Sequence, residues 1–173
     1  MLERGERFNR PIFNLFSLTQ ALRGAHGMQQ FSYSERGLAL TKSFEGLQLE
    51  AYRDCAGIWT IGFGHTGVGV VAGEAVSEME AEVLLRGDLA EAVACVNRSV
   101  DGEISQGQFD AMVDFCFNAG RGNFAQSTLL RKVNGGDFAG ASAQFALWVH
   151  AGGEVVAGLV RRRNAEAELF GSK

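Results

Sequence analysis

The hydrophobic pattern along the chain changes period twice, and its first clear segment is helical. Leu40 and Phe44 form an i,i+4 apolar pair. Ser34 stands where an N-cap belongs, and Gly46 stands where a helix commonly stops. We therefore expect a first helix over about 35–45.

Residues 47–73 follow a period of two, which is typical of strands. Trp59, Ile61 and Phe63 alternate with threonine and glycine positions, and segment 54–57 begins with Asp and ends with Gly, as a type I turn often does. The pattern predicts a small, twisted antiparallel sheet.

Beyond Gly73 every segment has helical signals. Two capping boxes, each a serine followed three residues later by Glu or Gln, are Ser77–Glu80 and Ser105–Gln108. They predict a long helix to about residue 95 and another to about residue 120. Further helices are expected over 127–134, 137–150 and 159–169. The predicted class is α+β, with a sheet lobe at about 47–73 and a helical lobe at about 76–173, joined by the long helix with a cleft between them.

Residues 1–34 differ from the predicted domain of residues 35–173. Four Arg against two Glu give this segment a charge of +2, and its apolar residues are clustered. They predict a basic amphipathic extension. It is either a helix or tail on the domain, or an interfacial segment that contacts anionic lipid. It lacks the pattern of a signal peptide, so we expect synthesis in the cytoplasm without export.

Composition and charge exclude some functions. A net charge of −4 disfavours a general nucleic-acid binder, and the one basic run, 161–163, is expected to pair with Glu166 and Glu168. The three cysteines form no CxxC pair and match no zinc spacing, so we expect no metal and mostly buried, reduced thiols. Gly62–Gly67 satisfies GxGxxG, but no βαβ unit follows it, which argues against a dinucleotide site.

Three residues near the predicted sheet could carry chemistry. Glu45 ends the first helix, where the macrodipole disfavours an anion and favours the protonated form that a general acid needs. Asp54 follows nine residues later at the first position of the turn, and Thr60 lies in the strand with its hydroxyl facing away from the apolar row. Each also has an ordinary explanation, as a surface Glu, a turn-forming Asp and a β-branched strand residue.

Together these residues fit glycoside hydrolysis. That reaction needs a protonated carboxyl beside the leaving oxygen and an ionised carboxylate across the sugar. The helix end and the hairpin supply two elements on which such carboxyls can stand. The separation of the carboxyls decides between retention and inversion, so both outcomes stay open at this point.

The surrounding sequence resembles a known family. The segments that carry the resemblance are Phe44-Glu45-Gly46, Tyr52-Arg53-Asp54, residues 57–67 (GIWTIGFGHTG), residues 108–120, Ser127-Thr128-Leu129-Leu130 and residues 158–170. They are similar to the phage-type lysozymes of glycoside hydrolase family 24, which include the T-even and lambdoid phage muramidases. The spacing of Glu45, Asp54 and Thr60 matches that family without a gap, and the resemblance covers about residues 35–173.

The resemblance implies a lysozyme-like fold and hydrolysis of the β-1,4 bond between N-acetylmuramic acid and N-acetylglucosamine in peptidoglycan, without a cofactor or metal. Glu45 would be the general acid, Asp54 the second carboxylate and Thr60 the residue that steadies water, with an inverting outcome. Asn118 and Gly64 are the expected substrate-binding residues, although a polar residue at a helix end explains Asn118 equally well.

The resemblance also implies a structural pair and an access route. His65 and Asp88 are the expected ion pair, linking the sheet to the long helix. The enzyme is expected to be a monomer that releases phage progeny by host lysis, made in the host cytoplasm and reaching the wall through a lesion made by a holin-type protein. Membrane contact through residues 1–34 is the alternative route.

Two other functional hypotheses remain. A glycan-binding module without catalysis would bind wall fragments but release no reducing ends. A nucleic-acid binder would show steep salt dependence, which the acidic balance disfavours. Cys55, next to Asp54, departs from the pattern of the family. A disulfide at that position would distort the turn. We expect an inert thiol there.

Overall fold

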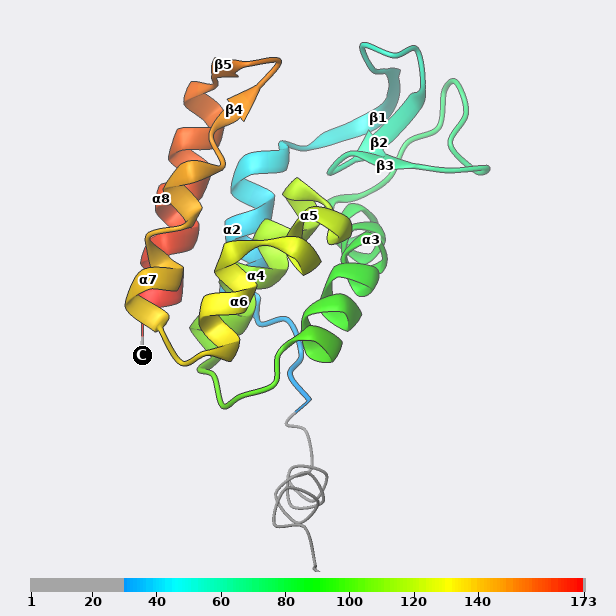
Figure 1. Ribbon diagram of the computed structural model, residues 1–173. Helices are drawn as coiled ribbons and strands as arrows, with labels where there is room; N and C mark the ends of the chain where they lie inside the picture. The colour runs from blue at the N-terminus through cyan, green and yellow to red at the C-terminus, as the bar shows by residue number, and fades with distance from the viewer. Residues whose placement is uncertain (1–29, 173) are drawn as a thin grey trace, which may run out of the picture.

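A small sheet stands at one end of a body of helices in the computed structural model, which describes residues 30–172 (Figure 1). The first helix, α2, spans Glu35–Glu45 as the pattern predicts, and the Ser34 hydroxyl caps it by accepting the Gly37 N–H. Gly46 ends it with a φ of 71°, a backbone conformation that favours glycine. The chain then passes directly into the sheet.

The sheet has three antiparallel strands in the order β1-β2-β3, spanning Gln48–Arg53, Trp59–Gly62 and His65–Thr66. Thr60 lies opposite Tyr52 on one side and Thr66 on the other. Opposite residues in a ladder point to the same face, so these three side chains share a face. The predicted small antiparallel sheet is confirmed, and its last strand ends at Thr66.

The helical lobe follows, with capping boxes at Ser77 and Ser105 as expected. Its elements are α3 (Glu78–Ser99), α4 (Gln106–Ala119), α5 (Arg121–Gln126), α6 (Thr128–Asn134), α7 (Phe138–Ser142), η1 (Phe145–Leu147), β4 (His150–Ala151), β5 (Glu154–Val155) and α8 (Ala157–Gly171). The helices predicted to end near residues 95 and 120 and those over 127–134 and 159–169 are all present. The α+β class is confirmed.

The single helix predicted over 137–150 is wrong. That stretch contains α7, a 3₁₀ turn and the first strand of a hairpin, β4–β5, so the chain after Gly73 is not helical throughout. Gly152 and Gly153 have φ values of 59° and 87° and form the hairpin turn. The strands have two residues each, too short to show an alternating pattern. The short helix α5 was not predicted either.

Helix α4 forms the centre of the core. Its residues 109–116 are all buried, because α2, α3 and α8 pack around it. A helix buried on all sides is expected to be apolar all round, yet this stretch contains Asp110 and Asp114, both almost without solvent exposure. These two acids therefore need partners inside the protein.

Residues 30–34 already pack on the domain. Phe31 stacks on Phe109 with ring centroids 5.0 Å apart, and its N–H donates to Asn97 Oδ1. The prediction of an amphipathic helix in the N-terminal segment concerns residues outside the described range. Within residues 30–172 no helix has the length and apolar character needed to cross a membrane.

Candidate active site

Glu45 occupies the last position of α2, and a cation lies beside it. Its Oε1 accepts a hydrogen bond from Arg162 Nη1 at 2.6 Å, and its side chain is 24% exposed. Arg162 lies in α8, 117 residues after Glu45 in the sequence. The guanidinium offsets the negative end of the helix dipole, so the anion expected to be unfavourable at this position has a built-in partner.

Asp54 stands at the turn between β1 and β2. Its carboxylate Oδ1 accepts the backbone N–H groups of Ala56 at 2.9 Å and Ile58 at 2.8 Å, and its carbonyl accepts the Gly57 N–H at 2.9 Å. The turn-forming role is therefore real. Both side-chain bonds go to Oδ1, so Oδ2 is the oxygen that can face water or substrate.

Thr60 is nearly buried, at 4% exposure, in the middle of β2. Its hydroxyl donates to the Ile58 carbonyl at 3.1 Å. The hydroxyl face of β2 is shared with Tyr52, which is 40% exposed and two residues from Asp54. Because Tyr52 lies opposite Thr60 in the ladder, it shares the face of Thr60, although the sequence did not single it out.

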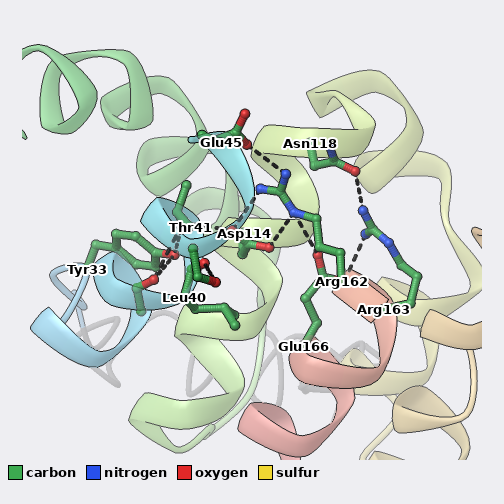
Figure 2. A network of polar contacts seen from close by, with 11 residues as sticks. Tyr33, Leu40, Thr41, Glu45, Asp114, Asn118, Arg162, Arg163 and Glu166 are labelled. Carbon is green, nitrogen blue, oxygen red and sulfur yellow. Dashed lines mark hydrogen bonds and ion pairs between the residues drawn. The ribbon is translucent and has the colours of Figure 1, made fainter. Parts of the chain in front are cut away.

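Arg162 is the hub of the polar network in Figure 2. Its Nε and Nη2 donate to the two oxygens of Asp114, each at 2.9 Å, which is a bidentate pair. Thr41 Oγ1 donates to Asp114 Oδ1 at 2.7 Å, and the Tyr33 hydroxyl lies 2.7 Å from Thr41. The third arm of the guanidinium holds Glu45. One buried arginine thus joins α2, α4 and α8 (Figure 2).

Arg163 joins Glu166 and Asn118 in the second part of the network. Its Nη1 donates to Glu166 Oε2 at 2.8 Å, and its Nη2 donates to Asn118 Oδ1. Within the described residues, Glu166 Oε1 is buried without a hydrogen-bond partner, and Arg162 Nε lies 3.7 Å from it. Asn118, in the last turn of α4, is fixed by this arginine, so its amide nitrogen is the group left to interact elsewhere.

The network perturbs the acids inside it in opposite directions. Burial alone would favour neutral Asp114, but the hydrogen bonds and charge of Arg162 outweigh burial and lower the pKa of Asp114 below its ordinary value. Burial, with the neighbouring Asp114 carboxylate, raises the pKa of Glu166 to about 10. A neutral Glu166 can still accept from Arg163 through Oε2 and carry its proton on Oε1.

His65 and Asp88 lie together, as the resemblance implied. His65 Nδ1 is 2.9 and 3.0 Å from the two carboxylate oxygens, which joins β3 to α3. Gly64, in the turn before β3, has a φ of 94°, and an added Cβ would meet no atom within 4 Å. At this position the positive φ, and not a lack of space, disfavours a residue with a side chain.

Several expectations about individual residues can now be compared with the structure. The arginine run pairs with Glu166 as expected, but no ion pair with Glu168 is found among the described residues. The pairing of Arg162 with Glu45 and Asp114 was missed. The available signal was Asp114, a charge inside an apolar helix. Cys95 and Cys116 are buried thiols, Cys55 is exposed, and none of the three forms a disulfide.

Among residues 30–172, no group of three or more His, Cys, Asp and Glu side chains is arranged to hold a metal ion. The acids near Glu45 pair with arginine and backbone groups. The chemistry that this arrangement can support is proton transfer and stabilisation of positive charge by carboxylates.

A carboxyl at the end of a helix and a second on the adjoining hairpin turn, within a small sheet on a helical body, form the arrangement that the sequence resemblance implies. The family model for phage lysozyme matches residues 42–166. The endolysin of Acyrthosiphon pisum secondary endosymbiont phage 1 is 43% identical over 143 residues, which cover 80% of this chain and 97% of the relative.

Other relatives agree with this result. The endolysin of Bacillus phage B103 is 43% identical over 139 residues, 79% of this chain but about half (53%) of that protein. The solved muramidase domain of SpmX from Asticaccaulis excentricus is 41% identical with a TM-score of 0.76, and the match covers 82% of this chain and 99% of that one. The chain belongs to the phage lysozyme family. It is a muramidase-type peptidoglycan hydrolase of phage-mediated lysis, and its fold is lysozyme-like.

Proposed function

We propose that the protein cleaves the β-1,4 bond between N-acetylmuramic acid and N-acetylglucosamine, with Glu45 as the general acid and Asp54 as its carboxylate partner. Support comes from the way the two carboxyls are mounted. Glu45 ends α2, only Gly46 and Leu47 separate it from β1, and Asp54 follows the last residue of β1. Each carboxyl is held by fixed donors, so neither must be ordered when substrate binds.

In this mechanism Glu45 protonates the leaving glycosidic oxygen, and Asp54 stabilises the positive charge that develops on the sugar. Arg162 Nη1 is in place to bind the Glu45 carboxylate once the proton has left. Thr60 steadies the attacking water from the same face as Tyr52, and we propose an inverting outcome. The anomer first released from a soluble glycan oligomer, followed by NMR, distinguishes inversion from retention.

We further propose that Asn118 and Gly64 bind substrate. Because Asn118 Oδ1 already accepts from Arg163, its amide N–H group is the part available, which suits a carbonyl oxygen such as that of an acetamido group. Gly64 would bring a bare backbone against the sugar. The change Asn118→Asp keeps the acceptor but removes the donor, so it should raise KM more than it lowers kcat.

Access to the wall is part of the proposal. The protein would act as a monomer, made in the host cytoplasm and released by a holin-type protein. Residues 1–34 offer a second route, through contact with anionic lipid. Lysis of cells with an intact outer membrane by the full chain, but not by a shortened chain beginning at Gln30, would support that route; equal lysis by both would contradict it.

The decisive experiment is Glu45→Gln, assayed by release of reducing ends from purified peptidoglycan. General acid catalysis contributes about 100- to 10,000-fold, so activity should fall at least about 100-fold while the thermal unfolding transition remains. Glu103→Gln, an identical change at an exposed loop residue between α3 and α4, is the matched control. Retained activity in Glu45→Gln would overturn the assignment, and mass spectrometry of the digest identifies the bond cut.

A further inference from the structure

The guanidinium of Arg162 serves two carboxyls at once. Nε and Nη2 hold Asp114 at 2.9 Å each, and Nη1 holds Glu45 at 2.6 Å. Arg162 and Asp114 are almost completely buried, at 5% and 0% side-chain exposure, whereas Glu45 retains 24%. The inner carboxyl is therefore permanently engaged, and the outer one is the carboxyl that water and substrate can reach.

An arginine beside a general acid creates a problem. A cation within hydrogen-bonding distance favours the ionised form of a carboxyl by roughly one to three pH units, and an ionised Glu45 cannot donate a proton. Asp114 changes that balance, because its full negative charge lies against the same guanidinium. Glu45 then faces an arginine–aspartate dipole rather than an isolated cation.

We propose that Asp114 is a positioning residue that neutralises Arg162, so that Arg162 can orient Glu45 without keeping it ionised. The inference rests on the proposed role of Glu45 as the acid. The hydroxyl of Thr41, which donates to Asp114 at 2.7 Å, supports the ionised state of Asp114 from the opposite side. The chain of contacts continues through the Tyr33 hydroxyl to the Gly37 carbonyl, within α2.

The other charged groups of the cluster do not replace Asp114. Arg163 donates to Glu166 and Asn118, and among the described residues it makes no hydrogen bond or ion pair with Glu45 or Asp114. Arg162 Nε is 3.7 Å from Glu166, beyond hydrogen-bonding distance. Glu166 is fully buried with an unpartnered oxygen, which suits a protonated carboxyl and not a second anion. Among the described residues, Glu45, Asp114 and Glu166 lie within 4 Å of the Arg162 guanidinium. Tyr33 and Arg163 are the further titratable groups that it influences electrostatically.

The test is the alkaline limb of the pH profile of kcat, measured as reducing ends released from peptidoglycan at saturation. In Asp114→Asn the uncompensated Arg162 should hold Glu45 ionised, which moves the limb to lower pH by about one to three units. In Arg162→Gln the limb should move to higher pH. A purely structural role would lower kcat at every pH and leave the limb in place.

The double variant Asp114→Asn/Arg162→Gln carries the test if Asp114→Asn does not fold, because it leaves no unpaired member of this buried pair. The proposal predicts a limb that lies closer to the wild-type limb than the Arg162→Gln limb does, since both charges of the pair are removed together. A limb that moves as far upward as in Arg162→Gln would overturn the proposal, as would an unmoved limb in a folded Asp114→Asn protein.

Two further variants separate the explanations. Glu166 contacts the same arginines, but Glu166→Gln should leave the alkaline limb unchanged, because Glu166 is already neutral. A downward shift equal to that of Asp114→Asn would assign the role to Glu166 and overturn the proposal. Glu45→Gln is assayed in parallel. If that variant stays active, the proposed acid is wrong; if it is inactive while the Asp114→Asn limb does not move, only the role of Asp114 is wrong.

Discussion

Glu166 allows a direct thermodynamic test, because its raised pKa makes the free energy of unfolding depend on pH. Its value of about 10 in the folded protein compares with an ordinary 4.5. Between these values the folded chain keeps a proton that the unfolded chain has lost. Each pH unit in that window lowers stability by about 1.36 kcal/mol. From pH 6 to pH 9 this single group should cost the wild type about 4 kcal/mol.

Glu166→Gln keeps the shape of the neutral acid but has no proton to lose. Its unfolding transition should match the wild type near pH 5 and exceed it by about 5 kcal/mol at pH 9, which corresponds to roughly 10–20 °C in Tm for a chain of this size. The assay is thermal unfolding by circular dichroism at half-unit steps from pH 5 to pH 9. Glu168→Gln, an exposed residue of the same helix, should follow the wild type.

Two parallel curves for Glu166→Gln and the wild type would refute this reasoning. That result would mean that Glu166 is ionised and paired with Arg163 throughout. In that case Glu166→Gln should instead lose about 3–5 kcal/mol at neutral pH, because it would break a buried ion pair. The two readings therefore differ in sign at pH 9, and a single pair of melting curves separates them.

Three other outcomes are expected. Asp114→Asn should lower the free energy of unfolding by about 3–5 kcal/mol at neutral pH. Because the pKa of Asp114 is lowered in the folded protein, this loss should shrink as pH falls below about 4. A loss under about 1 kcal/mol at neutral pH, measured by urea titration, would contradict the burial of Asp114. Asp88→Asn should cost less than about 1 kcal/mol, because His65 and Asp88 are 25% and 32% exposed. Gly46→Ala should cost about 1–3 kcal/mol and reduce activity, since a side chain at a φ of 71° strains the turn behind Glu45; an active variant with an unchanged Tm would show that the turn adapts.

Local signals in the sequence predicted those parts of the fold that local chemistry determines. The capping boxes at Ser77 and Ser105 act within three residues, and both helices begin where the boxes stand. The β4–β5 hairpin escaped because each strand has two residues, fewer than an alternating pattern needs.

In the candidate site, too, residues marked by local features could be predicted, and contacts made by packing could not. Glu45 and Asp54 could be singled out because a helix end and a turn are local features. Arg162 could not be connected with either Glu45 or Asp114, which lie 117 and 48 residues away in the sequence. Helical spacing finds partners three or four residues apart, and it correctly gave the pair of Arg163 with Glu166. Partners brought together by packing leave no periodic trace.

Two apparent faults in the sequence explain each other once the fold is known. Glu45 places an anion at the negative end of α2, and Asp114 places an anion in the fully buried stretch of α4. Either alone would destabilise the protein. Arg162 lies between them. Its charge pairs with Asp114 and its Nη1 binds Glu45, and these contacts fix the end of α2 against α4 and α8. Apolar residues would often stabilise such a junction equally well or better, so stability alone does not account for three charged groups there. The proposed role of Arg162 and Asp114, which is to hold Glu45 in place without keeping it ionised, does account for them.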